Sequence, residues 1–144
     1  MKIRFDALRG LARHVIMAGI MIALSAVVAP SPSHAASCTA TTNSAFATTI
    51  ANGHAYTKHK DEFVKGKVID NLAFPDATIA SAGEFATFLK GILDAPSENK
   101  SLANSRAAYW DNRTGTIIIT NANAGDCGTA FRPTDGVTYY NQQK

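Results

Sequence analysis

Side chains that could perform acid–base and phosphate chemistry fall into two clusters far apart in the sequence. The first is Gly53-His54-Ala55-Tyr56-Thr57-Lys58-His59-Lys60, which contains the only two histidines outside the N-terminal leader. The second is Gly128-Thr129-Ala130-Phe131-Arg132-Pro133, followed by Tyr139. If the fold joins the clusters, imidazole, ammonium, guanidinium and hydroxyl groups would surround one site. Such a set suits the metal-free cleavage of a phosphodiester.

The cleavage of RNA assigns each of these groups a role. A base must remove the 2′-hydroxyl proton, an acid must protonate the leaving 5′-oxygen, and cations must stabilise the charged phosphorane. Histidine suits both proton transfers because its pKa lies near neutrality, so His54 and His59 are the candidate base and acid, in either order. The other candidates would bind the phosphate oxygens, and they are Lys58, Arg132, Thr129 and Tyr139.

The spacing of the first cluster limits how its side chains can meet. On a regular helix, His54 and Lys58 share a face because they are four residues apart. His59 lies about 140° away from His54 around the helix axis. Both imidazoles can therefore enter one pocket only if the local chain is irregular, which Gly53 would permit. The alternative is that both histidines are ordinary polar positions on a surface helix.

Residues 1–35 are predicted to be an export signal. An apolar run over residues 15–28 has signal-peptide length, and the four basic residues before it are Lys2, Arg4, Arg9 and Arg13. Ser33-His34-Ala35 fits the small-residue cleavage pattern. We therefore expect residues 36–144 to form one secreted or periplasmic domain without stable membrane insertion. An uncleaved membrane anchor and a lipoprotein acylated at Cys38 are the alternatives.

Removal of the leader would change the charge balance. The chain carries 14 Lys+Arg and 11 Asp+Glu, and the leader holds four of the basic residues and one acid, Asp6. Ten basic and ten acidic residues would remain, so the domain would be neutral. A neutral domain lacks the broad positive field that attracts nucleic acid nonspecifically, and any such function must depend on a local site.

The two cysteines, Cys38 and Cys127, could form a disulfide, since an exported chain meets oxidising conditions. That bond would tie the start of the domain to a late loop, and free thiols are the alternative. The two cysteines and two histidines outside the leader do not have the paired spacing of metal ligands, so we expect no metal site, and no cofactor motif is present.

The hydrophobic pattern predicts helices first and strands afterwards. From Ser44, helical spacing predicts two short helices or one bent helix, interrupted at Asn52-Gly53. Residues 65–75 are predicted to form a loop. Ser81 and Glu84 form a capping box before an apolar stripe that runs from Phe85 to Leu93.

The C-terminal part has the pattern of an antiparallel sheet. Residues 106–111 and 116–120 flank a turn and predict a β-hairpin, with further strands over 129–132 and 137–141. The predicted fold class is therefore α+β, with N-terminal helices packed on a C-terminal antiparallel β-meander of about four strands.

Residues 50–141 contain an ordered set of short motifs. They are Gly53-His54-Ala55-x-x-Lys58-His59 with Phe63, the helix 85–93, Arg106-Ala107-Ala108-Tyr109-Trp110-Asp111, Gly115-Thr116-Ile117-Ile118-Ile119, and Asp126-x-Gly128-Thr129-Ala130-Phe131-Arg132-Pro133 with Gly136 and Tyr139. In this order and spacing, they resemble the C-terminal toxin domains of filamentous-haemagglutinin and contact-dependent growth-inhibition proteins. Many such domains are ribonucleases, several in the barnase–EndoU–colicin–RelE class, in which a helix packs on an antiparallel sheet that bears the active site.

The resemblance implies a ribonuclease toxin that cleaves RNA, such as tRNA, without a metal or cofactor. It places His54, Lys58 and His59 in the first cluster of the site. It places Arg106, Thr129 and Arg132 on the sheet. An immunity or antitoxin protein would be its partner. The chain departs from the pattern in its own leader, which predicts a standalone secreted copy, and in Cys127, which precedes the Gly-Thr strand.

Two other function classes fit the same sequence. One is a non-enzymatic exported binding domain on the same scaffold, and the other is a different chemistry on the toxin fold, such as ADP-ribosyl transfer or an NAD-directed reaction. The relative position of the two clusters in the fold distinguishes an enzyme from a non-enzymatic binding domain. An enzyme requires His54, Lys58 and His59 to lie beside Thr129 and Arg132, whereas a binding domain does not.

Overall fold

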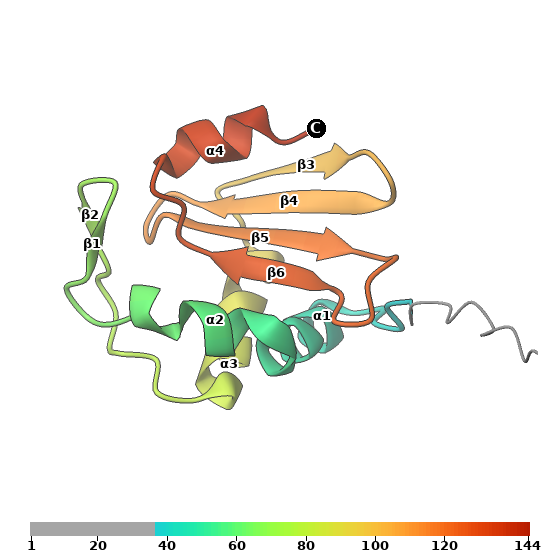
Figure 1. Cartoon of the computed structure of the whole chain (residues 1–144), viewed down its shortest axis with the longest axis horizontal. Coiled ribbons are helices and arrows are strands. Elements are labelled where there is room, and N and C mark those ends of the chain that lie inside the picture. The colour runs from blue at the N-terminus through green and yellow to red at the C-terminus, as the bar shows by residue number, and fades with distance from the viewer. Residues whose placement is uncertain (1–36) are drawn as a thin grey trace, which may run out of the picture. The chain divides into compact units, whose positions relative to one another are not determined.

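The computed structural model describes residues 37–144, so the predicted leader lies outside the described residues. Helices occupy the N-terminal side and a four-stranded antiparallel sheet lies toward the C-terminus (Figure 1). The predicted α+β class is therefore confirmed. None of the helices within residues 37–144 is long and apolar enough to cross a membrane.

The N-terminal helical segment is bent, as the sequence predicts. The Thr42 hydroxyl caps its start by accepting a hydrogen bond from the Ala45 N–H at 3.2 Å. Gly53 leaves helical geometry, with φ −73° and ψ −140°, and makes the bend. The segment has four consecutive pieces, namely α1 (Asn43–Ile50), the π-helical turn η1 (Ala51–Ala55), α2 (Tyr56–His59) and the 3₁₀ turn η2 (Lys60–Glu62).

Helix α3 (Ala82–Asp94) begins at the predicted capping box. The Ser81 hydroxyl accepts a hydrogen bond from the Glu84 N–H at 3.2 Å. The Glu84 carboxylate accepts one from the Ala80 N–H at 2.8 Å, one residue before the position that a capping box would use. The predicted stripe faces inward, and its buried members are Phe85, Leu89, Ile92 and Leu93.

The sheet has the strand order β3-β4-β5-β6, and every neighbouring pair is antiparallel. Its strands are β3 (Glu98–Leu102), β4 (Arg106–Asp111), β5 (Thr116–Asn121) and β6 (Gly128–Phe131). Strands β4 and β5 are the predicted hairpin, and β6 covers most of the third predicted strand. Residues 65–75, predicted as a loop, contain a separate short hairpin of β1 (Val68–Ile69) and β2 (Leu72–Ala73).

The prediction of a strand over residues 137–141 is wrong, because this segment is helix α4 (Gly136–Gln142). The fourth strand of the sheet is instead β3, which precedes the hairpin. Gly136 has a φ of +52°, and an added Cβ there would lie 1.7 Å from a carboxylate oxygen of Asp70. A glycine adopts this conformation at the start of α4 without steric cost, and the absent Cβ leaves room for the Asp70 carboxylate. Helix α4 then packs Tyr140 against Trp110, with ring centroids 6.1 Å apart.

Both faces of the sheet are covered. On one face, Ile118 and Ala130 join the core that α1, η1 and α3 supply, with Tyr109 packed at its margin. The other face packs against α4 through a second cluster, whose buried members are Ala108, Trp110, Ile117, Ile119 and Tyr140. The polar side chains described below converge at one end of this second face, next to α4.

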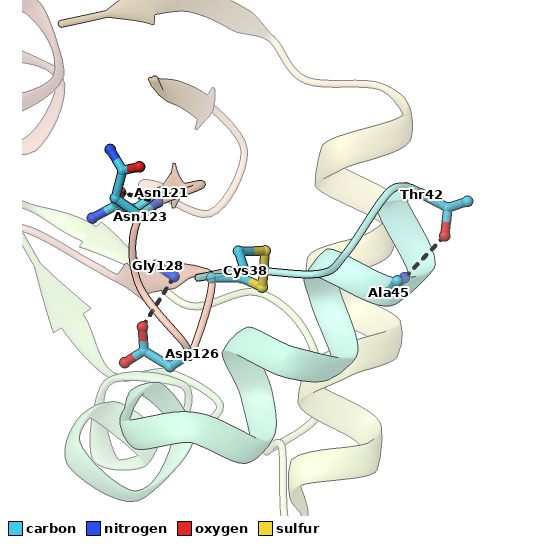
Figure 2. The surroundings of a disulfide bond; sticks show 8 residues. Cys38, Thr42, Ala45, Asn121, Asn123, Asp126 and Gly128 are labelled. Carbon is cyan, nitrogen blue, oxygen red and sulfur yellow. Dashed lines mark hydrogen bonds between the residues drawn. A yellow bond between two sulfur atoms is a disulfide. The ribbon is translucent and has the colours of Figure 1, made fainter. Parts of the chain in front are cut away.

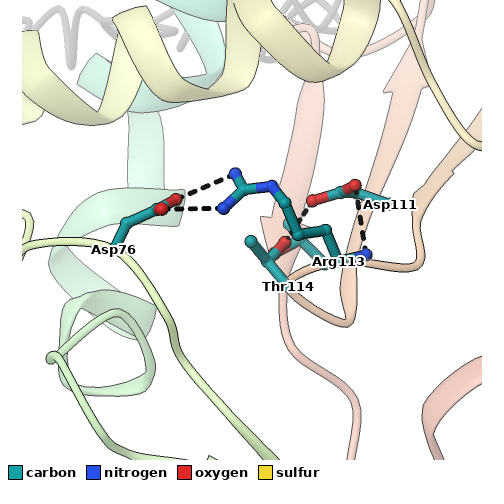
Figure 3. Close-up of polar contacts among 5 residues, drawn as sticks. Asp76, Asp111, Arg113 and Thr114 are labelled. Carbon is teal, nitrogen blue, oxygen red and sulfur yellow. Dashed lines mark hydrogen bonds and ion pairs between the residues drawn. The ribbon is translucent and has the colours of Figure 1, made fainter.

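Polar contacts fasten the β4–β5 turn to the loop that follows β2 (Figure 3). Arg113 makes a bidentate ion pair with Asp76, at 2.7 and 2.9 Å. The Thr114 hydroxyl donates a hydrogen bond to the Asp111 carboxylate at 2.6 Å, within the turn itself. The turn thereby presents the Thr114 carbonyl to the guanidinium of Arg132, at 2.7 Å.

The predicted disulfide between Cys38 and Cys127 is present (Figure 2). It joins the arm before α1 to the loop between β5 and β6, and the two residues are 89 positions apart. In the chain-entropy model, closing a loop of this length stabilises the folded state by up to about 4–5 kcal/mol. Persistent disulfides are typical of oxidising compartments, which fits an exported protein.

Candidate functional site

The bend in the first helical segment sets the position of His54. Its Nδ1 lies 2.7 Å from Oδ2 of Asp126, in the loop between β5 and β6. The approach depends on Gly53, because a Cβ at that position would lie 2.8 Å from the Cβ of Asp126. The glycine predicted to make the chain irregular thus also lets the helix touch the loop.

Asp126 is held from both sides. Its Oδ1 accepts a hydrogen bond from the Gly128 N–H at 3.3 Å, as Figure 2 shows, while Oδ2 contacts His54. Since a carboxylate only accepts hydrogen bonds, this contact favours the imidazole tautomer with its hydrogen on Nδ1. The Nε2 atom of a neutral ring in that tautomer carries a lone pair and can take a proton. His54 and Asp126 together form a base with an orienting carboxylate.

A hollow of about 340 Å³ lies at this dyad, and we call it the His54 hollow. It is bounded by the helix bend, by the end of the sheet and by α4. The side chain of His54 is 48% exposed and that of Asp126 33% exposed, so solutes can reach both. The residues that line it are His54, Arg106, Ile119, Asn121, Ala124, Asp126, Gly128, Thr129, Tyr139 and Gln143.

Strand register explains why residues distant in sequence meet in the hollow. Arg106 on β4 pairs with Asn121 on β5, and Ile119 on β5 pairs with Thr129 on β6. These positions therefore cross the sheet at one end. Tyr139 reaches the same place from α4, and its ring packs edge-on against Phe131 at 5.3 Å.

The guanidinium of Arg106 is oriented by main-chain carbonyls. Its Nε donates to Ala103 O and its Nη2 donates to Lys144 O, each at 3.1 Å. These two bonds fix the plane of the group and leave Nη1 for a ligand. An anion in the hollow would therefore meet a preorganised cation, and the imidazole of His54 also lines the hollow.

Four of the seven predicted site residues thus line one hollow, namely His54, Arg106, Thr129 and Tyr139. The other three are not among its lining residues. Lys58 is exposed on α2, on the chain segment that follows the bend. His59 and Arg132 are engaged elsewhere, and each has partners that account for its position.

His59 is packed away from the hollow. Its Nδ1 lies 2.6 Å from the Glu62 carboxylate, and its ring stacks on Phe131 at 5.3 Å. The side chain is only 14% exposed. Phe131 is therefore a shared neighbour of His59 and of Tyr139, whose ring lines the hollow. The structure therefore pairs His54 with a carboxylate and not with a second imidazole.

Arg132 is buried and acts as a brace. Its guanidinium donates to the main-chain carbonyls of four residues at 2.7–3.0 Å, which are Glu62, Lys67, Leu72 and Thr114. Burial lowers the pKa of Arg132, and the nearby Glu62 carboxylate opposes that shift. A phosphate could reach this group only by displacing those carbonyls. We therefore leave Arg132 out of the candidate site.

The sequence analysis names Asp126 only within the motif Asp126-x-Gly128-Thr129 and does not count it among the candidate site residues. The residue does stand in a turn, but its carboxylate faces the helix bend 72 positions earlier in the chain. The available signal was its place directly before the Cys127-Gly128-Thr129 segment, which carries both a predicted disulfide and a predicted site residue.

No family model matches this chain, and no curated protein shows significant sequence similarity to it.

Proposed function

We propose that the protein is a metal-independent endoribonuclease whose active site is the His54 hollow. The observation that carries this proposal is the convergence of a histidine–carboxylate dyad, an oriented arginine and two hydroxyl side chains on one accessible hollow. Each of these groups performs a step that phosphodiester cleavage requires, and no further group has to be supplied.

The proposed reaction is an internal transfer of the phosphate. Nε2 of His54 takes the proton from the 2′-hydroxyl, and the 2′-oxygen forms a bond to phosphorus. Arg106 and Thr129 donate hydrogen bonds to the phosphate oxygens, on which charge increases in the transition state. The bond from phosphorus to the 5′-oxygen then breaks, and Tyr139 is the candidate donor of a proton to that oxygen.

The setting of the site is part of the proposal. A secreted toxin of the type found in contact-dependent growth inhibition would carry such a domain, with RNA as its target and an immunity protein as its partner. The Cys38–Cys127 disulfide supports an oxidising compartment for the mature protein. The near equality of acidic and basic residues supports recognition by a local site instead of by a broad basic surface.

The test is cleavage of total RNA and of tRNA in EDTA by the oxidised protein and its variants. We expect His54→Ala to lose about 100-fold or more in rate, because positioned acid–base groups contribute about that much. Asp126→Asn should also lose activity, since an amide can donate to Nδ1 and so favour the wrong tautomer. His59→Ala is the matched control, and it should cleave at a rate close to that of the unsubstituted protein.

Two outcomes would contradict this assignment. Full activity in His54→Ala would remove the catalytic role of the hollow. A folded, oxidised protein that cleaves no RNA but binds it would favour the alternative of a non-enzymatic exported binding domain.

A further inference from the structure

The loop that carries Asp126 has one buried anchor. Within residues 122–127, only the Cys127 side chain is fully buried, whereas Ala122, Asn123 and Gly125 are exposed. Cys127 is the covalent neighbour of Asp126. The position of the dyad carboxylate therefore depends on where the Cys127 side chain is held.

The partner of that anchor belongs to the layer that carries His54. Cys38 donates a main-chain hydrogen bond to Ala122 O at 3.0 Å, so the arm contacts the loop both at Ala122 and at Cys127. Five residues later the chain enters α1, where Asn43 donates to Leu93 O at 3.1 Å and so fixes the start of the helix on α3. The disulfide thus fixes the position of the Asp126 loop relative to the helical segment that bends next to His54.

The backbone at the anchor adds a second reason why the bond matters. Cys127 has a φ of +61°, a left-handed conformation that a residue with a Cβ seldom adopts without restraint. Two main-chain hydrogen bonds hold Cys127 in this conformation, to Ala124 O at 2.9 Å and from the Asn121 N–H at 2.8 Å, and the disulfide adds a covalent restraint on its side chain. Once the disulfide is broken, Cys127 can return to a negative φ. Rotation about its N–Cα bond would then move the carbonyl and the side chain of the preceding residue, Asp126.

Apart from Cys127, which belongs to the core under α3, the loop contributes little to the packing of the rest of the fold. The sheet ladder, the core under α3 and the cluster under α4 do not involve residues 122–126. Loss of the disulfide should therefore loosen the loop before it unfolds the domain.

We infer that the Cys38–Cys127 disulfide positions Asp126 against His54, so that the site is assembled in the oxidised protein and disassembled in a folded reduced protein. The consequence is that the chain is weakly active in a reducing cytosol and becomes active once it is oxidised after export. This consequence rests on the proposed function. Asp126 is in this respect a positioning residue, and the disulfide acts through it.

The switching chemistry is thiol–disulfide exchange with a dithiol. A thiolate of the dithiol attacks Cys38 Sγ, which is the more accessible sulfur because Cys38 is half-buried and Cys127 is buried. The protein disulfide breaks as a mixed disulfide forms. The second thiol then releases Cys38, so the protein gains two electrons and two protons while the dithiol becomes a disulfide.

The first experiment compares the oxidised protein with Cys38→Ser, which frees the loop but keeps the buried Cys127 side chain. Backbone amide spectra establish that the variant is folded. We expect RNA cleavage to fall by at least about 10-fold, toward the level of Asp126→Asn, because carboxylates that orient a histidine contribute more than this in comparable dyads. The ring nitrogen signals of His54 should also lose the preference for hydrogen on Nδ1, which a purely structural bond would not affect.

A second variant keeps the inference testable if Cys38→Ser does not fold. Two glycines inserted between Thr39 and Ala40 leave the disulfide intact but lengthen the arm between the bond and α1. We expect this oxidised variant to be folded and to lose cleavage and the His54 ring signature in the same way. The unmodified protein treated with dithiothreitol should match Cys38→Ser.

The outcomes separate the two proposals. If the lengthened arm or a folded Cys38→Ser leaves both cleavage and the His54 ring signals unchanged, the positioning role of the disulfide is wrong. If the oxidised unsubstituted protein cleaves no RNA, the proposed function fails, and the ring signals alone then decide whether the disulfide positions Asp126.

Discussion

At the scale of single residues, the site depends on Gly53, which has no side chain. Gly53 allows the helix bend to approach Asp126, and an alanine there would place its Cβ 2.8 Å from the Cβ of Asp126. One of the two backbones must then move, which lengthens the contact between Asp126 and His54. We predict that Gly53→Ala lowers RNA cleavage by about 10-fold or more, through the same loss of orientation as Asp126→Asn.

Gly91→Ala provides the matched control for this substitution. An added Cβ at Gly91 meets no atom within 4 Å, and the residue lies inside helix α3. Alanine should therefore raise the free energy of unfolding by about 0.5–1 kcal/mol and leave cleavage unchanged. Rates are compared at equal folded fractions. Normal activity in Gly53→Ala would show that the close approach is not needed for catalysis.

The sequence predicted part of the site because some residues have chemistry that is visible without a fold. His54, Arg106, Thr129 and Tyr139 were all candidates, and the structure brings them to one hollow. Asp126 was not a candidate, since an aspartate in a turn-rich segment is ordinary. Its role comes from a contact across 72 residues, which depends on sheet register and on the helix bend together.

Arg132 shows the opposite limit of sequence reasoning. A guanidinium next to Thr129 suits phosphate chemistry, and nothing in the local sequence says that its donors will be used internally. The structure satisfies them with carbonyls from the β4–β5 turn, from the end of η2 and from the β1–β2 hairpin. Burial therefore decides its role, and burial is a property of the whole fold.

At the scale of elements, Arg132 is what joins the small hairpin to the sheet. We predict that Arg132→Met lowers the free energy of unfolding by about 3–5 kcal/mol, because it leaves buried carbonyls without donors and removes a hydrogen-bonded charge. The measurement is urea-induced unfolding. Cleavage per folded molecule should stay close to that of the unsubstituted protein.

Arg113→Met is the control for that experiment, since Arg113 is also bidentate but pairs with Asp76 at the surface. Its side chain is 57% exposed, so the loss should be about 0–1 kcal/mol. A large loss of cleavage in folded Arg132→Met, with little loss of stability, would contradict the bracing role and return Arg132 to the site.

Helix α4 gives a prediction that depends on pH. Burial against the sheet raises the pKa of Tyr140, and the charge of Glu98 raises it further. Above the ordinary tyrosine pKa near 10, the phenol ionises in the unfolded chain before it ionises in the folded one. The stability that its neutral form contributes is therefore complete below about pH 10 and is lost as the pH rises through the folded pKa.

We predict that the free energy of unfolding falls less steeply between about pH 9 and pH 11 in Tyr140→Phe than in the unsubstituted protein. Phenylalanine keeps the packing on Trp110 and has no proton to lose. Lys100, which lies 4.6 Å above the Tyr140 ring, is present in both proteins, so the difference isolates the phenol. Parallel slopes would mean that ionisation of Tyr140 is not coupled to folding.

The elements that the sequence predicted well have strong local signals. Helix α3 has a cap and a continuous apolar stripe, and the β4–β5 hairpin has β-branched and aromatic arms around a turn. Residues 137–141 have a valine and two tyrosines, which favour a strand locally, yet they form helix α4, whose Tyr140 packs on Trp110. Strand β3 was missed because its edge sequence, Glu98–Leu102, is mostly polar and has no alternating pattern.

At the scale of the whole molecule, the charge balance limits how RNA can be held. Ten basic and ten acidic residues remain after the predicted leader, and several of the basic ones are used internally, such as Lys90 with Asp94 and Arg113 with Asp76. The hollow itself contributes one permanent cation, Arg106, and a second when His54 is protonated. Few phosphates can therefore be neutralised at once.

The salt dependence of binding measures that number directly. For single-stranded nucleic acid, the slope of log K against log salt concentration is about −0.7 for each phosphate neutralised, so one or two contacts predict a slope between about −0.7 and −1.4. The ligand is a short 2′-O-methyl RNA, which lacks the attacking hydroxyl and stays intact. Arg106→Gln should reduce the magnitude of the slope by about 0.7, whereas Lys58→Gln, which alters a lysine outside the hollow, should leave it unchanged. A slope steeper than about −3 would require at least four phosphate contacts, and RNA would then be held by a wider surface than the His54 hollow.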